Sequence, residues 1–209
     1  MKQPQMFKVA AVILAAGMSS RMGQMKVLLP WGENKTILEH IIAQLNRAQV
    51  NPIIVVTGHL SVEVQEKAAP LGVNVVHNLD YKTGEMLSSL KVGLRDMPAH
   101  IEAVLVVLGD QPRIQTNTIY QVMQAFIEGR GEIVAPSFER RRGHPILIGR
   151  RFWQEILDLP NDGAPRDVIN AHSDRVAYVE VDNDSILRDV DTPADYAEER
   201  LRALLDKPD

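Results

Sequence analysis

The chain has 209 residues, a formal net charge of −4 and no cysteine. It can therefore form one α/β domain with a substantial core, and it cannot use disulfides, a cysteine nucleophile or thiolate metal sites. Acidic and basic residues are mixed, with no basic run longer than Arg140–Arg142, which argues against polymeric nucleic acid as a partner. Because the chain lacks a signal-peptide core and any apolar run near the ~18 residues of a membrane span, we expect a cytoplasmic protein without membrane contacts.

Apolar, β-branched runs alternate with amphipathic segments along the chain, and such runs are typical of strands buried on both faces of a parallel sheet. The predicted strands are Val9–Leu14, Ile53–Thr57, Val73–His77, Ala103–Leu108, Glu132–Pro136, Pro145–Ile148 and Arg175–Val179. The predicted helices are Thr36–Ala48, Ser61–Ala69, Leu87–Asp96, Thr118–Glu128 and one opening at Thr192. The alternation predicts a single-domain, three-layer α/β/α fold with a mostly parallel, Rossmann-like sheet.

Two features refine this prediction. Thr36 and Glu39 form a capping-box pattern at the start of the first helix. The charged segment Phe138–Gly143 predicts a β-hairpin tip on a later, partly antiparallel section of the sheet. Parallel sheets of this kind bind ligands beyond the carboxyl ends of their strands, so we sought the site in the loops that follow strands.

The first predicted strand is followed by a small loop that carries two cations. Residues Leu14–Lys26 include Gly17, Arg21 and Lys26. A strand followed by a loop whose backbone N–H groups can approach a ligand, together with two cations, suits a polyphosphate. The spacing matches neither the P-loop nor the G-x-G-x-x-G fingerprint. We interpret Met22 as an anchor of this loop in the core.

Carboxylates suited to Mg²⁺ lie at two other places in the chain. Asp110 follows the strand Ala103–Leu108, and a carboxylate facing a polyphosphate there is a natural Mg²⁺ ligand. In the segment 189–195, helix capping accounts for the threonine, the proline and the last aspartate, and it leaves Asp189 and Asp191 unexplained. These two side chains project to one face of an extended chain, so one or both can point at the same metal.

The segment Leu14–Lys26 resembles the motif L-[AG]-[AG]-G-x-x-x-R-[ML]-G-x-x-K of the MobA-like NTP transferase superfamily at every defined position. Members of that superfamily transfer a nucleoside monophosphate from an NTP to a phosphate. The resemblance implies a nucleotide-diphospho-sugar transferase-like fold in one domain over residues 1–209. Its nucleotide-binding half would cover about 8–112 and its acceptor-binding half about 113–209. It also implies that Asp191, directly before Thr-Pro, joins Asp110 as the second metal ligand, with Asp189 as its support.

The resemblance assigns roles to individual residues. Lys26 would lie near the α-phosphate, where charge builds up, and Arg21 would hold the outer phosphates bidentately. Arg21, Lys26 and Asp110 are therefore the predicted catalytic residues, and Mg²⁺ is the predicted cofactor. The residues predicted to bind the nucleotide are Leu14, Ala15, Ala16, Gly17, Ser19, Arg21, Lys26, Gly84, Ser88 and Asp110.

Further segments resemble one branch of the superfamily, the molybdenum cofactor cytidylyltransferases. These segments are Leu14–Gly17, Gly109–Pro112, Gly84–Gly93, Gly143–Pro145 and Asp162–Arg166. The resemblance implies CTP and a molybdopterin-type cofactor with a terminal phosphate as substrates, and transient contact with a molybdoenzyme or its chaperone. The residues predicted to bind the acceptor are Gln111, Pro112, His144 and Arg166.

Two alternatives remain open at this point. The same transfer chemistry could act on a sugar-, alditol- or choline-phosphate. The chain could also be a cofactor-binding or chaperone-like module without turnover. A module that only bound its ligand would have no need of the second carboxylate, so Asp110 together with Asp191 favours an enzyme.

Overall fold

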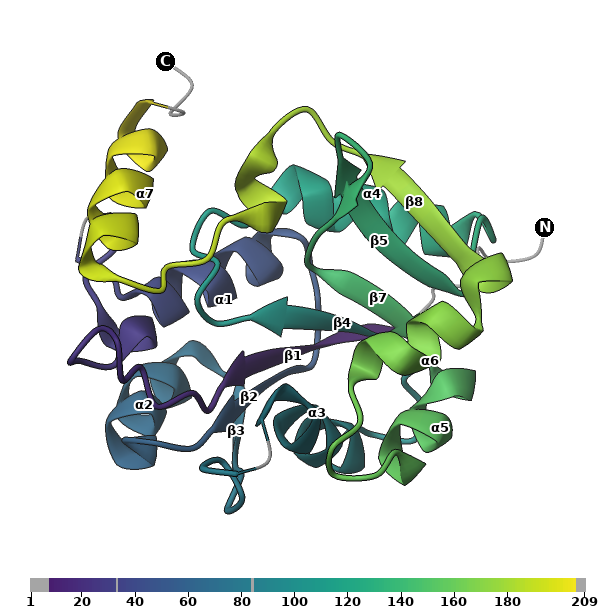
Figure 1. Cartoon of the computed structure of the whole chain (residues 1–209), viewed down its shortest axis with the longest axis horizontal. Coiled ribbons are helices and arrows are strands. Elements are labelled where there is room, and N and C mark those ends of the chain that lie inside the picture. Colours follow the sequence, from purple (N-terminus) through teal and green to yellow (C-terminus); the bar gives the residue numbers. More distant parts are fainter. Residues whose placement is uncertain (1–7, 33, 84, 206–209) are drawn as a thin grey trace.

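The computed structural model describes residues 8–32, 34–83 and 85–205, whose strands form one sheet (Figure 1). Within these residues the sheet has eight strands in the order β3-β2-β1-β4-β7-β5-β6, with β8 also paired to β5. The strands are β1 (Val9–Ala15), β2 (Ile53–Thr57), β3 (Asn74–His77), β4 (Ala103–Leu108), β5 (Ile133–Phe138), β6 (Arg141–Arg142), β7 (Ile146–Gly149) and β8 (Val176–Glu180). The helices are α1 (Ile37–Arg47), α2 (Ser61–Ala68), α3 (Glu85–Arg95), α4 (Thr116–Ile127), α5 (Trp153–Asp158), α6 (Pro165–Ala171) and α7 (Pro193–Leu205).

Most pairings in this sheet are parallel. β1 pairs in parallel with β2 and β4, β2 pairs with β3, and β5 pairs with β8. β7 runs antiparallel to β4 and β5, and β6 runs antiparallel to β5. The prediction of a mostly parallel sheet with a small antiparallel section is therefore confirmed.

The antiparallel section begins at a β-hairpin between β5 and β6. Phe138 pairs with Arg141, and the residues between them, Glu139 and Arg140, have φ angles of 49° and 64°. Positive φ at both central residues is typical of the two-residue turn that suits the twist of hairpin strands. The predicted hairpin tip is confirmed.

The helices cover both faces of the sheet and create two apolar cores (Figure 1). Ala11 and Ile13 of β1 pack in the core beneath α1, α2 and α4. Ala10 and Val12 pack in the other core, beneath α3, α5 and α6. Successive side chains of a strand point to opposite faces, so a strand between two helix layers is apolar at every position. This burial explains the uninterrupted apolar runs in the sequence.

The ends of the predicted helices are largely correct. The N-cap of α1 has both contacts of the capping box: Glu39 N donates to Thr36 Oγ1 at 3.2 Å, and Thr36 N donates to Glu39 Oε2 at 2.6 Å. α3 and α4 each begin two residues earlier than predicted, which is within the usual uncertainty of helix ends.

The sequence analysis did not predict α5 and α6. They have only six and seven residues, so neither shows enough apolar periodicity to be recognised. Pro165 occupies the first turn of α6, and Asp167 accepts a hydrogen bond from Ala164 N at 2.8 Å. Among the helices of the described segments, none is long and apolar enough to cross a membrane.

Candidate active site

The loop after β1 and the segment after β4 lie side by side at the carboxyl edge of the sheet. β1 and β4 are parallel neighbours with Leu14 opposite Leu108, and Gly109 N donates to the Leu14 carbonyl at 3.0 Å. A Cβ atom on Gly109 would lie 2.7 Å from that carbonyl oxygen and 2.9 Å from Cγ1 of Val27. Glycine is therefore required because the ends of two strands approach closely. Asp110 follows it and is held at the same edge.

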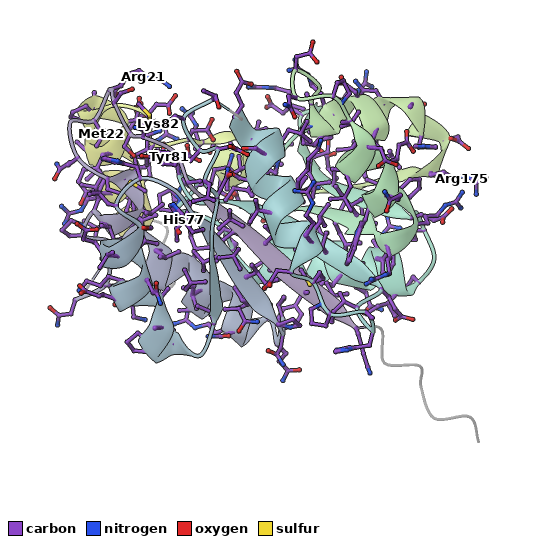
Figure 2. All side chains as sticks on the ribbon, turned by 90° about the horizontal axis from the view of Figure 1, so that it is seen from below. Arg21, Met22, His77, Tyr81, Lys82 and Arg175 are labelled. Carbon is purple, nitrogen blue, oxygen red and sulfur yellow. The ribbon has the colours of Figure 1, made fainter. Side chains whose placement is uncertain are left out.

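Local contacts fold the β1 loop back on itself. Ser19 has a φ of 51°, its carbonyl accepts from Met22 N at 3.0 Å, and its hydroxyl accepts from Lys26 N at 3.0 Å. Met22 and Met25 are buried in the core, so the predicted anchoring by Met22 is confirmed. Arg21 is exposed and lies at the outer margin of the molecule in Figure 2. The anchored loop thus presents Arg21 to solvent and turns Lys26 inward.

The four charged residues predicted for the site meet in one cluster. Lys26 Nζ lies 2.5 Å from Asp191 Oδ1 and 3.4 Å from Asp110 Oδ2. Arg21 Nη2 lies 2.9 Å from Asp191 Oδ2. The lysine side chain is only 13% exposed, whereas about a third of each carboxylate side chain is open, at 33% for Asp110 and 32% for Asp191. Two cations and two carboxylates from three distant segments thus share one partly open site.

The N-terminus of α7 holds Asp191 in this cluster. Asp195 accepts hydrogen bonds from Asp191 N at 3.1 Å and from Thr192 N at 2.7 Å. In return, Asp195 N donates to Thr192 Oγ1 at 3.2 Å. This is the reciprocal capping expected from the sequence, and it leaves the Asp191 carboxylate free to face the two cations.

Two further contacts join the segments that carry Asp110 and Asp191. Val190 N donates to the Asp110 carbonyl at 2.8 Å. The buried Gln111 donates from Nε2 to Asp189 Oδ1 at 2.7 Å. Asp189 therefore contacts Gln111, while Asp191 contacts the cations. Sequence reasoning did not find the contact between Gln111 and Asp189, because it joins residues far apart in the chain and follows no local pattern.

The two carboxylates have opposite pKa shifts. Burial raises the pKa of Asp110 above its usual value, although the nearby Lys26 acts in the other direction. The hydrogen bond from Lys26 lowers the pKa of Asp191, and the charge of Arg21 lowers it further. The contacts of Asp191 thus favour its anionic form, whereas burial disfavours the anionic form of Asp110.

Asp110 and Asp191 are the residues that could hold a metal ion. The Lys26 ammonium already lies between them, which shows that both carboxylates converge on a single positive charge. Mg²⁺ prefers one or two carboxylates completed by phosphate oxygens and waters. This donor set fits such an ion.

A cavity of about 90 Å³ adjoins the charged cluster. The predicted nucleotide-binding residues that line it are Leu14, Ala15, Gly17, Ser19, Lys26 and Asp110. Ala16 is buried beside them. Ser88 lines a different cavity, where its hydroxyl accepts from Asn78 Nδ2 at 2.8 Å. Gly84 lies outside the described residues.

A larger cavity of about 350 Å³ lies between α3, α6 and the antiparallel strands. His144 and Arg166, both predicted to bind the acceptor, line it together with Arg142 and apolar side chains such as Val106 of β4. Burial lowers the pKa of His144 to about 4, with a contribution from the charge of Arg142, so the ring is neutral near pH 7. Sequence reasoning treated Arg142 as part of a charged run. Arg142 lies two residues before His144, and side chains two residues apart project to the same side of an extended chain. This spacing could have indicated that Arg142 lines the same cavity as His144.

The other two residues predicted for the acceptor lie elsewhere. Gln111 is buried against Asp189. Pro112 lines a groove with Trp31 and Arg113, between α1 and α7. The structure therefore brings His144 and Arg166 together and does not bring Gln111 or Pro112 into their cavity.

This chain is similar to known proteins in both sequence and fold. Residues 11–176 match the family model of the MobA-like NTP transferase domain. The molybdenum cofactor cytidylyltransferase of Escherichia coli is 34% identical over 194 residues, which cover 91% of this chain and 95% of that protein. The crystal structure of an Rv0371c homologue from a Mycobacterium species matches with a TM-score of 0.81 at 29% identity, over 96% of this chain and 98% of that one.

A second solved structure, the manganese complex of Rv0371c from Mycobacterium tuberculosis, has a TM-score of 0.76 and 25% identity. It covers 91% of this chain and 97% of its own. The family match spans most of the chain and includes Arg21, Lys26 and Asp110, while Asp191 lies beyond its end. The chain therefore belongs to the MobA-like NTP transferase family and is a nucleotidyltransferase.

Proposed function

We propose that this enzyme transfers CMP from CTP to the terminal phosphate of a molybdopterin-type cofactor, releases pyrophosphate and depends on Mg²⁺. The observation that carries the proposal is the convergence of Arg21, Lys26, Asp110 and Asp191 at the ends of β1 and β4. The nature of the Escherichia coli relative, a molybdenum cofactor cytidylyltransferase, supports the choice of nucleotide and acceptor.

The first half of the chain, about 8–112, would hold CTP through the β1 loop. Its backbone N–H groups near Gly17 and Ser19 suit a polyphosphate. Lys26 and Arg21 would exchange their carboxylate partners for phosphate oxygens, with Lys26 near the α-phosphate and Arg21 near the outer ones. A lysine beside the α-phosphate acts where negative charge increases during transfer.

Asp110 and Asp191 would hold the Mg²⁺ ion. When bound, this ion supplies charge neutralisation for the phosphates. The raised pKa of Asp110 fits a ligand whose ionised form is favoured by a divalent cation. The manganese complex of the Mycobacterium relative supports a divalent cation in this fold.

The second half of the chain, about 113–209, would bind the acceptor in the cavity lined by His144 and Arg166. Its apolar walls suit a flat heterocycle, and Arg142 with Arg166 suits a phosphate. The neutral His144 can donate one hydrogen bond and accept another. An oxygen of the acceptor phosphate would attack the α-phosphorus of CTP, a new P–O bond would form, and the bond to the leaving pyrophosphate would break.

The test is pyrophosphate release with Mg²⁺ and purified molybdopterin cofactor, with CTP, GTP, ATP and UTP compared in parallel. Release with CTP alone is the expected result. Release with another nucleotide would overturn the proposed donor. Release only when sugar-, alditol- or choline-phosphate replaces the cofactor would overturn the proposed acceptor. No release with any pair of nucleotide and acceptor would show that the enzyme does not catalyse the proposed reaction.

A further inference from the structure

α7 connects the segments that carry the charged cluster. It begins at Pro193, two residues after Asp191, and stands on the side of the molecule toward which β1 and β4 point (Figure 1). The hydroxyl of Tyr196 donates to the carbonyl of Pro30, four residues after Lys26. One turn further along, Glu199 Oε2 accepts from Arg113 Nη1 at 3.0 Å, three residues after Asp110. One helix thus contacts the segments behind both Lys26 and Asp110.

The contact between Arg113 and Glu199 is a buried ion pair. The exposed fractions of the two side chains are 7% and 3%. Asp184 lies 3.7 Å from Arg113 Nη1, and Asp184 also binds Arg188 at 2.6 Å and Arg202 at 3.7 Å. The pair therefore sits within a network whose other members come from α7 and from the segment just before Asp191.

Stability alone does not account for a buried ion pair at this place. Removing two charges from water costs about as much as their attraction returns, and apolar replacements of such pairs are often neutral or stabilising. The pair instead fixes the relative orientation of the two segments that carry it, because a guanidinium and a carboxylate bind in a narrow range of geometries. A fixed geometry here sets where the start of α7 lies relative to the end of β4.

All of these contacts restrict the position of Asp191 relative to Asp110. Val190 N donates to the Asp110 carbonyl. The contact of Arg113 with Glu199 then joins the segment that follows Asp110 to α7, which follows Asp191. We propose that Arg113 and Glu199 are positioning residues that hold Asp191 against Asp110 at the spacing needed to share one divalent cation. This inference rests on the proposed metal-dependent function.

The test measures how strongly Mn²⁺ raises the affinity for CTP, by calorimetric titration of CTP with and without the metal. The main variant is Arg113→Met/Glu199→Leu, which removes the ion pair without leaving a single buried charge. We expect its CTP affinity without metal and its Tm to match the wild type. We expect the enhancement by Mn²⁺ to fall about 10-fold, the lower end of the usual effect of losing a residue that orients a metal ligand.

Two companion variants separate positioning from general stability. Glu198→Gln removes the exposed neighbour, which pairs with Arg202 on the same helix, and it should leave the Mn²⁺ enhancement unchanged. Glu199→Asp keeps the charge and withdraws it by one methylene, and it should give an intermediate enhancement. If the enhancement follows Tm across the three variants, the pair is only structural and the proposal is wrong.

The outcome also distinguishes this inference from the function on which it rests. An Arg113→Met/Glu199→Leu protein with the wild-type enhancement would overturn the positioning role and leave the metal site intact. A wild-type protein whose affinity for CTP does not respond to Mn²⁺ would overturn the proposed metal site itself, and the positioning role with it.

Discussion

The substitution Lys26→Met tests the charged cluster most directly, because it keeps an unbranched side chain, one atom shorter, and removes the ammonium group. Lys26 Nζ contacts Asp191 at 2.5 Å and Asp110 at 3.4 Å. The lysine is nearly buried, and both carboxylates are about one-third exposed. A charged hydrogen bond contributes about 1.5–3 kcal/mol when protected, and an exposed ion pair contributes about 0–1 kcal/mol. We expect the variant to lose about 2 kcal/mol of unfolding free energy near pH 7, in the lower half of the first range because both carboxylates are partly exposed.

A divalent cation should reverse this loss of stability. Without the ammonium, Asp191 keeps its contact with the exposed Arg21, and a bound Mg²⁺ should stabilise the two carboxylates more than it does in the wild type. A ligand at 100 times its dissociation constant stabilises a protein by about 2.7 kcal/mol, which is enough to compensate. Turnover should nevertheless stay about 10²–10³-fold below the wild type, because the positive charge at the reacting phosphate is still missing.

Denaturant unfolding with and without Mg²⁺, combined with the pyrophosphate-release assay, measures both effects. Lys67→Met is the matched control, since Lys67 is an exposed lysine of α2, and it should change neither quantity. A Lys26→Met enzyme with turnover within a few fold of the wild type would refute the role of Lys26 at the reacting phosphate. An unfolding free energy that stays low at saturating Mg²⁺ would refute the idea that ammonium and metal use the same two carboxylates.

Three further substitutions test the surroundings of this cluster. Gly109→Ala places a methyl group 2.7 Å from the Leu14 carbonyl oxygen and should lower the unfolding free energy by about 1–3 kcal/mol. An unchanged unfolding free energy in denaturant titrations would mean that the ends of β1 and β4 can move apart at little cost. Because the folded state lowers the pKa of His144 from 6.5 to about 4, its contribution to stability is complete above pH 6.5 and is lost as pH falls toward 4. The difference in unfolding free energy between wild type and His144→Gln should therefore shrink by up to about 3 kcal/mol between pH 7 and pH 4, and a constant difference would contradict the shift. Arg142→Met should raise the KM for the acceptor about tenfold and leave the KM for CTP unchanged, whereas equal increases would contradict a role of Arg142 in binding the acceptor.

The fold could be predicted from the sequence where the signal is local and long. The apolar run around Ile13 predicts a strand buried on both faces, and the structure packs its two sides in separate cores. The capping-box pattern predicts a helix that opens at Thr36, and Thr36 is the N-cap of α1 in the structure. α5 and α6 were missed because six or seven residues are too few for a periodic pattern, and their helical state depends on packing against the sheet.

The charged cluster could be predicted because its members lie in loops beside recognisable elements and match the motifs of the family. Arg21 and Lys26 belong to the loop after a strand, and Asp191 precedes a helix cap. The supporting contacts could not be predicted in the same way. Glu199 is one of three consecutive charged residues on an amphipathic helix, and only the three-dimensional structure shows that this one is buried against Arg113.

The position of Lys26 explains how two carboxylates can be held so close together. Like charges near one another oppose each other's ionisation, and the pKa of Asp110 is raised by burial and further by the charge of Asp189. The ammonium between them offsets that repulsion, so the fold can hold the carboxylates in place before any ligand binds. On the proposed function, the same ammonium would move to the α-phosphate when CTP binds. A divalent cation held by Asp110 and Asp191 would supply the positive charge that Lys26 withdraws, so Lys26 could serve the reaction without destabilising these two carboxylates.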